Sequence, residues 1–253
     1  MTVHDHPTGG YRYSRGSRFA AHGVVSQPGF TVDHAVFDTY RHWDQGFAGI
    51  RAHLESQDRP LAALAGIELR MPAPLEFEEF KKLNDRYLAQ LAAWELLIDG
   101  ESPFCRTNVA PTRNSLDGPA IAAFSYTVPE PSGRPAGFVL SGAAEVPLGA
   151  AFPEGVVRRG ETVPDAMVEK ASLVADLMDE HLASLDLTWE PDLQVHLYAA
   201  HDVAFAVSRT LLAERKVAPN MGIIWHDAAP PTHEIELEID LRRYRAEHLL
   251  ASA

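Results

Sequence analysis

Apolar residues recur at helical spacing in two long segments of the chain. In residues 35–56 the steps alternate between four and three: Val36, Tyr40, Trp43, Phe47, Ile50 and Leu54. Residues 163–185 have a similar set: Met167, Ala171, Val174, Met178 and Leu182. Such spacing places the apolar side chains along one face of a helix. Both segments are therefore predicted to be amphipathic helices.

Short segments of alternating apolar and polar residues follow each predicted helix. Residues 66–71 and 193–198 alternate with a period of two, which is typical of a β-strand with one buried face. A second helix is predicted after each strand, on apolar stripes that begin at Phe80 and Val203. Each half then ends in two more predicted strands: 106–110 with 121–128, and 221–226 with 233–242.

The order of these elements repeats at a constant offset. A shift of 128 residues superimposes equivalent apolar positions: Trp43 on Ala171, Ile67 on Val195, and Phe77 on Phe205. The segment 128–135 is rich in Pro, Gly and Ser and is predicted to be a linker. We therefore expect two tandem domains, residues 1–132 and 133–253. The second opens with an apolar strand at 137–142, and the first is expected to open with a hairpin within residues 11–32.

Composition and charge limit the possible partners. Hydrophobic residues make up 46% and charged residues 23% of the 253 positions, as in soluble globular proteins. No apolar run approaches the ~20 residues of a membrane-spanning helix, and the first residues lack the layout of a secretory signal. We expect no membrane association and a cytoplasmic location. The formal net charge of -13 argues against nucleic-acid binding, which depends on Lys and Arg neutralising phosphates.

Cysteine and histidine give little support for metal or disulfide chemistry. Cys105 is the single cysteine, so an internal disulfide is excluded. Of the 12 histidines, the closest candidates for metal ligands are two pairs: His4 with His6, and His196 with His201. Neither pair has a third ligand at metal-site spacing, so we expect no metal site.

Several phrases, in order along the chain, resemble the RidA/YjgF family. Phe138-Val-Leu-Ser-Gly142 is similar to the family's "F-V-S-G" strand, and Phe80–Tyr87 to its "F-x-x-x-N-x-x-Y" helix. Pro103–Val109 is similar to its "P-x-R-x-x-V" strand, and His233–Asp240 to its closing "x-E-I-E" strand. The resemblance implies an α+β fold of two tandem RidA/YjgF-like (chorismate-mutase-like) domains, each a mainly antiparallel sheet backed by two helices. It also implies a homotrimer with ligand sites in the clefts between domains.

The resemblance also implies an activity. Members of the family hydrolyse reactive enamines and imines to ketones and ammonia, or carry out related deaminations such as that of 2-aminomuconate. The expected protein is thus a hydrolytic deaminase of a small-molecule carboxylate substrate, an enamine or imine, that works without a metal or cofactor. The alternative is a non-catalytic ligand-binding or regulatory protein of the same fold, because neither half carries a complete set of the family's site residues.

The two expected catalytic groups come from different halves. Arg106 matches the arginine that holds the substrate carboxylate, and a guanidinium presents a fixed fork of donors that suits a carboxylate. The equivalent position in the second half is near Met221. Glu236 or Glu238 matches the glutamate that positions water, and the first half has no such acid. We expect one composite site, with Arg106 and one of these glutamates facing each other across a domain interface.

Three further residues are candidates for contact with the substrate. Asn108 takes the place of the family's cysteine, two residues after the matching arginine. Ser141 and Gly142 end the first strand of the second half, where glycine permits close approach of a ligand to the backbone. A plain turn after a strand would explain this Ser-Gly pair equally well.

Overall fold

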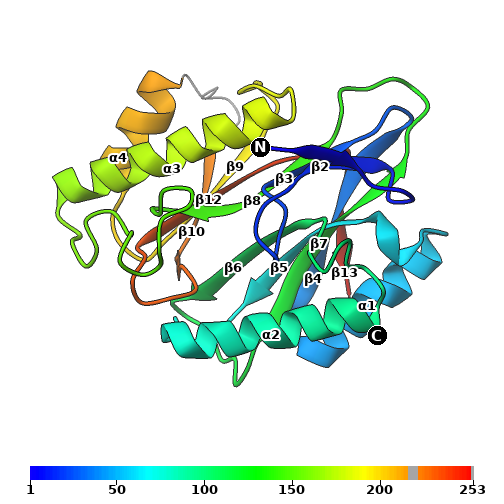
Figure 1. The fold of residues 1–253 in the computed structure, drawn as a ribbon, viewed down its shortest axis with the longest axis horizontal. Helices are drawn as coiled ribbons and strands as arrows, with labels where there is room; N and C mark the ends of the chain where they lie inside the picture. Colours follow the sequence, from blue (N-terminus) through cyan, green and yellow to red (C-terminus); the bar gives the residue numbers. More distant parts are fainter. Residues whose placement is uncertain (216–221, 252–253) are drawn as a thin grey trace.

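The computed structural model describes residues 1–215 and 222–251, and in this part of the chain two β-sheets pack against each other with helices on their outer faces (Figure 1). The layers run helix, sheet, sheet, helix. The class is α+β, as the sequence predicts. Both sheets are mixed, since each contains parallel as well as antiparallel pairs.

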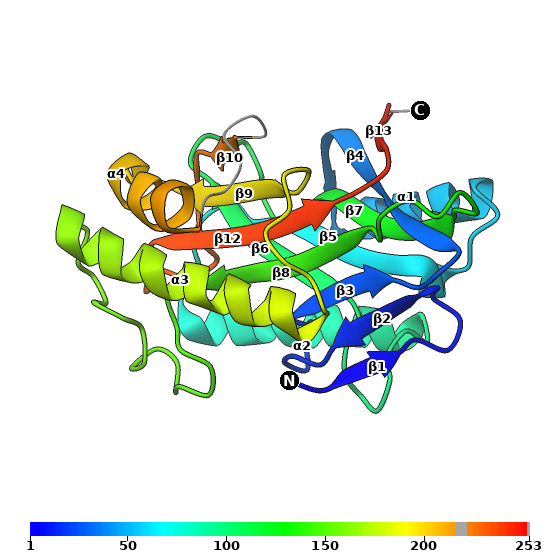
Figure 2. The same cartoon turned by 90° about the horizontal axis from the view of Figure 1, so that it is seen from above.

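The first sheet has the order β1-β2-β3-β8-β12-β9-β10. Its strands are β1 (Val3–Asp5), β2 (Tyr11–Ser14), β3 (Gly23–Ser26), β8 (Phe138–Ala144), β12 (Leu237–Arg243), β9 (Gln194–Ala199) and β10 (Ile223–His226). Its outer face carries α3 (Pro164–Ser184), α4 (Ala204–Val207) and the π-helical segment η2 (Ser208–Glu214), as Figure 2 shows.

The second sheet has the order β11-β6-β5-β7-β4-β13. Its strands are β11 (Ala228–Ala229), β6 (Cys105–Pro111), β5 (Leu64–Arg70), β7 (Ala120–Pro129), β4 (Phe30–His42) and β13 (Glu247–Leu250). Its outer face carries α1 (Trp43–Ser56) and α2 (Phe77–Ala93), and the short 3₁₀ turn η1 (Leu61–Ala63) precedes β5. Within the described ranges, none of the helices is long and apolar enough to cross a membrane.

The predicted apolar stripes form the buried faces of the two long helices they specify. In α1 the buried stripe residues are Trp43, Phe47, Ile50 and Leu54, and in α3 all five stripe positions are buried. The prediction was wrong for Val36 and Tyr40, which lie in β4 instead of the helix. Residues 30–42 pair with β7 over most of their length, and this long-range ladder outweighs the local helical spacing.

The ends of the chain add strands to opposite sheets. β2 and β3 form the hairpin predicted within residues 11–32, but β3 pairs with β8 of the second half. Conversely, β13 pairs with β4 of the first half. Four neighbouring strands in each sheet follow one order, β6-β5-β7-β4 in the second sheet and β10-β9-β12-β8 in the first. A division between residues 132 and 133 therefore stays a prediction, since each sheet takes strands from both sides of it.

Candidate active site

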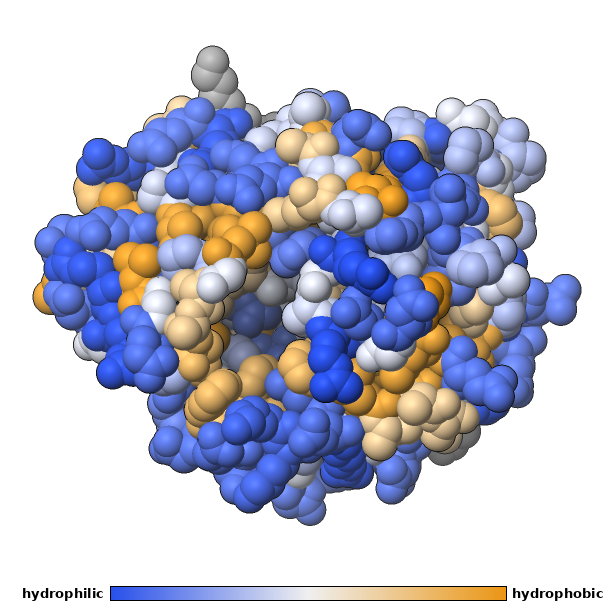
Figure 3. Space-filling view, viewed as in Figure 1, coloured by the Kyte–Doolittle hydropathy of each residue, from blue (hydrophilic) through white to orange (hydrophobic). Residues whose placement is uncertain are grey.

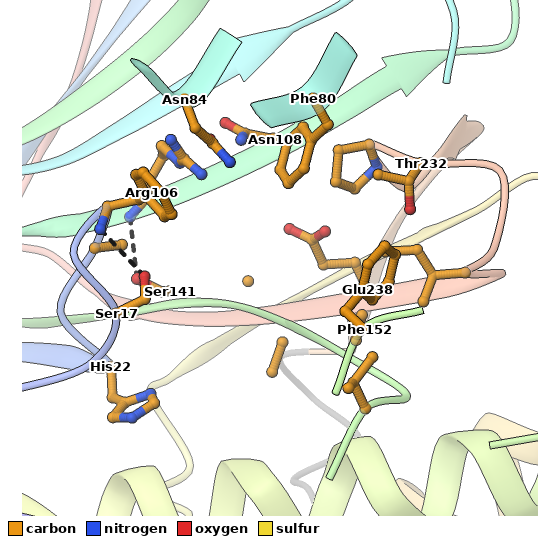
Figure 4. A pocket seen from close by; sticks show the side chains of 18 of the residues that line it. Ser17, His22, Phe80, Asn84, Arg106, Asn108, Ser141, Phe152, Thr232 and Glu238 are labelled. Atoms are coloured by element: carbon orange, nitrogen blue, oxygen red, sulfur yellow. Dashed lines mark hydrogen bonds between the residues drawn. The ribbon is translucent and has the colours of Figure 1, made fainter. Parts of the chain in front are cut away.

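A cavity of about 630 Å³ lies between α2 and α3 and is lined by residues of both sheets. Figure 3 shows its mouth as a hollow bordered largely by apolar residues. Five of the six residues expected at the site line this cavity: Arg106 and Asn108 of β6, Ser141 and Gly142 of β8, and Glu238 of β12. Two residues from opposite sheets, Arg106 and Glu238, thus face one space (Figure 4). Met221, expected at the position equivalent to Arg106, lies outside the described residues.

The guanidinium of Arg106 is held rigidly and keeps one donor atom free. In the orientation of the Asn108 amide that satisfies both groups, its oxygen accepts hydrogen bonds from Nε and Nη2 of Arg106 at 3.1 and 3.2 Å. The guanidinium carbon lies 4.8 Å from the ring centroid of Tyr87. Nη1 is buried and has no hydrogen-bond partner. The site therefore presents a fixed cationic donor to whatever enters the cavity.

Glu238 is a carboxyl group whose environment favours the protonated form. Burial and the negative charge of Asp240 raise its pKa to about 8, although Arg106 acts in the opposite direction. At neutral pH this group is therefore mostly a neutral acid that can donate a proton and, once ionised, accept one.

Gly142 makes room for that carboxyl group. A Cβ built at residue 142 would overlap Oε1 of Glu238 and lie 2.9 Å from its Cγ. Any side chain at this position would displace the carboxyl group from where it now lies. The absence of a side chain at Gly142 thus leaves space for the carboxyl group of Glu238, in addition to any contact with a ligand.

Ser141 holds the neighbouring elements together. Its hydroxyl donates to the carbonyl oxygen of Ala21 at 2.6 Å and accepts from the backbone N–H of Arg106 at 3.0 Å. These two bonds connect β8 to β6 and to the loop before β3. They fix the backbone from which the Arg106 side chain projects.

The structure separates the two glutamates that the sequence left as alternatives. Glu236 is not among the residues that line the cavity, and its carboxylate pairs with Nε2 of His201 at 2.9 Å. Glu238 is buried and faces the cavity. The difference arises because β12 begins at Leu237, so Glu236 precedes the strand instead of alternating along it.

A buried ion pair holds the start of β12. Glu145 accepts hydrogen bonds from the backbone N–H groups of Glu236 at 2.6 Å and Leu237 at 3.3 Å. Nζ of Lys170, on α3, lies 3.2 Å from Oε1 of Glu145, and both side chains are fully buried. The pair therefore fixes the strand that carries Glu238.

A second buried network joins the two sheets beside Glu238. Asp240 accepts hydrogen bonds from Thr107 of β6 and Tyr198 of β9, each at 2.9 Å. Burial opposes the ionisation of Asp240, but Arg242, 2.7 Å away, holds the pKa of this carboxyl below its ordinary value. Arg242 also pairs with Glu68 of the other sheet. The network keeps a negative charge next to Glu238.

The cavity is also lined by polar residues that sequence reasoning missed, and two of them lie on the helices at its sides. Asn84 of α2 and His181 of α3 both line it, and both are nearly fully buried. Oδ1 of Asn84 has no hydrogen-bond partner, and neither does either ring nitrogen of His181. Both residues could have been found in the sequence, because each is a polar residue at a position that the apolar spacing of its helix predicts to be buried. Buried polar groups normally have hydrogen-bond partners, so such positions are candidates for a binding site.

Neither the cysteine nor the metal-ligating side chains of the described residues suggest a nucleophile or a metal centre. Burial raises the pKa of Cys105 to about 12, and its Sγ donates to the carbonyl of Val139 at 3.1 Å. This thiol is therefore not a ready nucleophile. Across residues 1–215 and 222–251, no group of three or more His, Cys, Asp or Glu side chains is arranged to hold a metal ion.

Comparison with known proteins gives a family-level match over nearly the whole chain. The family model described as "2-aminomuconate deaminase CnbZ" matches residues 3–248. A Comamonas testosteroni protein, "2-amino-5-chloromuconate deaminase", is 31% identical over 237 residues, which cover 92% of this chain and 93% of that protein. Among solved structures, a chorismatase aligns with a TM-score of 0.52 at 12% identity, over 88% of this chain and 77% of its own. That likeness concerns the fold alone.

Proposed function

Because the chain belongs to the 2-aminomuconate deaminase CnbZ family, we propose that it removes the amino group of an aminomuconate-like enamine or imine by hydrolysis. Membership of this family supports an enzyme that acts on C–N bonds. The observation that carries the finer proposal is the meeting of Arg106 and Glu238, from different sheets, at one cavity. The reaction consumes one water and releases ammonia. The carbon that carried the amino group becomes the carbonyl carbon of a ketone.

Arg106 and Asn84 supply complementary contacts for the reacting end of such a substrate. The free Nη1 of Arg106 is a charged donor, which suits a carboxylate. The free Oδ1 of Asn84 is an acceptor, which suits the N–H of an adjacent amino group. Figure 4 shows the two side chains on the same side of the cavity. Buried polar atoms left without partners cost about 1–3 kcal/mol each, and a ligand with this pair of groups would remove that cost.

Glu238 is suited to the proton transfers of the reaction. With its pKa at about 8, it starts protonated at neutral pH and donates its proton to the enamine carbon, which produces a cationic iminium group. The resulting carboxylate accepts a proton from water as the water oxygen forms a bond to the iminium carbon, which gives a neutral tetrahedral intermediate and restores the protonated acid. Glu238 then protonates the nitrogen, ammonia leaves as the carbonyl double bond forms, and the hydroxyl proton returns to the carboxylate. These steps use only the named side chains and water.

The proposal is tested by ammonia release from 2-aminomuconate generated in situ. The wild-type protein should release ammonia well above the spontaneous rate, and Glu238→Gln should lower turnover at least ~100-fold, in line with the loss of a general acid–base group. The matched control is Glu236→Gln, which removes a carboxylate outside the cavity and should leave turnover unchanged. If the wild-type protein binds such carboxylates but releases no ammonia, the alternative of a non-catalytic binding protein replaces this proposal.

We also propose that the two halves are RidA/YjgF-like repeats and that the protein is a homotrimer. The common order of four neighbouring strands in the two sheets, β6-β5-β7-β4 and β10-β9-β12-β8, supports the repeat. Exposed apolar side chains at and near the edge strand β10, those of Phe205, Ile224 and Trp225, support burial in an assembly. Light scattering that gave a monomer at micromolar concentration would refute the trimer.

A further inference from the structure

The His181 ring is a buried polar group that has no hydrogen-bond partner among the described residues. It lies on α3, is 3% exposed and lines the cavity. A neutral imidazole carries one N–H donor and one acceptor lone pair, and here both ring nitrogens lack hydrogen bonds. Its ring contact is with His22, with centroids 4.4 Å apart and planes tilted by 31°.

The surroundings of His181 would accept an apolar side chain. Its neighbours on the buried face of α3 are Val174, Leu177, Met178 and Leu182. A polar ring in this setting loses its contacts with water and gains none from the protein. Unpaired polar groups of this kind in a cavity are typical of ligand-binding positions, where the ligand supplies the missing partner.

The position of this pair suits the far end of an elongated substrate. Figure 4 shows Arg106 and His22 on opposite sides of Ser141, with His22 directed toward α3. Arg106 has one free donor, which the proposed function assigns to the first carboxylate. The other cation that lines the cavity among the described residues is Lys81, which is paired with Glu78 of its own helix at 3.0 Å. Both side chains of this pair are more than half exposed, so a second carboxylate held in the buried part of the cavity needs a different donor.

We propose that His181, backed by His22, binds the carboxylate remote from Arg106, so that the cavity selects dicarboxylates over monocarboxylates of the same length. The identification of that group as a carboxylate rests on the proposed aminomuconate-like substrate. An N–H donor to a charged oxygen makes a strong hydrogen bond when water is excluded. Burial and the neighbouring His22 lower the pKa of His181 to about 3, so the ring is neutral at physiological pH and binds as an N–H donor.

The test compares two stable ligands that differ only at one end. The dicarboxylate trans,trans-muconate and the monocarboxylate sorbate have the same carbon skeleton, and calorimetry can measure both affinities. Wild-type protein should prefer muconate by roughly tenfold to a hundredfold, the usual effect of one charge-assisted hydrogen bond. His181→Phe keeps an aromatic ring beside His22 but removes both nitrogens, and should bind the two ligands equally. His181→Gln retains an N–H donor and should recover part of the preference.

A matched control is available in His53. This half-buried histidine of α1 lies outside the cavity-lining set and hydrogen-bonds the Tyr126 hydroxyl at 2.9 Å. His53→Phe should leave the preference for muconate unchanged. A purely structural role for His181 would make His181→Phe less stable, whereas removal of two unpaired buried nitrogens should keep or raise its melting temperature.

The outcomes separate this inference from the proposed reaction. Equal affinity of the wild-type protein for muconate and sorbate overturns the subsite, as does a preference that survives in both His181 variants. A preference that disappears in His181→Phe supports the subsite even if no ammonia is released from 2-aminomuconate. In that case only the proposed reaction fails.

Discussion

Replacement of Glu238 by glutamine is expected to stabilise the protein while it lowers turnover. In the folded state burial and Asp240 raise the pKa of Glu238 to about 8, against an ordinary value of 4.5. The unfolded chain loses this proton near its ordinary pKa, whereas the folded protein retains it until the pH approaches its raised value. Between the two pKa values the folded state binds more protons, so this group makes the wild-type protein less stable as the pH rises.

The size of the effect follows from the separation of the two pKa values. At about 1.4 kcal/mol for each pH unit, the cost is about 1 kcal/mol at pH 5 and about 3 kcal/mol at pH 7, and it levels off at about 5 kcal/mol above pH 8. Glutamine has nearly the same shape and does not ionise, so it carries none of this cost. The free energy of unfolding of Glu238→Gln should therefore exceed that of the wild-type protein by these amounts.

Urea denaturation at about pH 5, 7 and 9 measures the difference directly. Glu236→Gln is the control, since its carboxylate pairs with His201 outside the cavity, and its stability relative to wild type should change little over this range. The reasoning would be refuted by a Glu238→Gln advantage that stays constant from pH 5 to 9, or by one that shrinks as the pH rises. A constant advantage would mean that Glu238 ionises in the folded protein much as it does in the unfolded chain, and a shrinking one would mean that its pKa in the folded protein lies below the ordinary value.

Three other substitutions probe the site and its support. Arg106→Lys should weaken muconate binding roughly tenfold or more in calorimetry, because an ammonium cannot keep the guanidinium's internal contacts and still present a free donor. Gly142→Ala places a Cβ against the carboxyl group of Glu238, so ammonia release should fall about tenfold or more while circular dichroism stays close to wild type. Lys170→Met leaves the buried Glu145 without its ion-pair partner and should lower the free energy of unfolding by about 3–5 kcal/mol in urea denaturation.

The parts of the fold that the sequence predicts are those set by local pattern. The helices α1 and α3 follow from their stripes, although α1 begins later than predicted because β4 extends through Tyr40. The partner strand of the β2–β3 hairpin could not be predicted, since the pairing of β3 with β8 joins segments more than a hundred residues apart. Alternation alone specifies that a strand exists and which of its faces is buried, but not which sheet it joins.

The residues of the candidate site also fall into those that the sequence predicts and those that it does not. Arg106 and the candidate acids could be chosen by residue type and by resemblance to a known family. The choice between Glu236 and Glu238 depends on where β12 begins, which the alternating sequence does not specify. A polar residue within the apolar face of a helix marks Asn84 and His181 in the sequence. That both line one cavity, with hydrogen bonds that the folded protein leaves unmade, follows only from the structure.

The exchange of terminal strands between the halves limits how the cavity can admit and release a ligand. A hinge that swung the two halves apart would have to break the β3–β8 ladder, the β4–β13 ladder and the bonds made by Ser141. The exchanged strands hold the two halves together. Entry of substrate and release of product should therefore depend on small movements of the loops and side chains at the mouth of the cavity. Because each half supplies a strand to the other half's sheet, a polypeptide cut between residues 130 and 136 should yield fragments that fold poorly alone and regain structure when mixed.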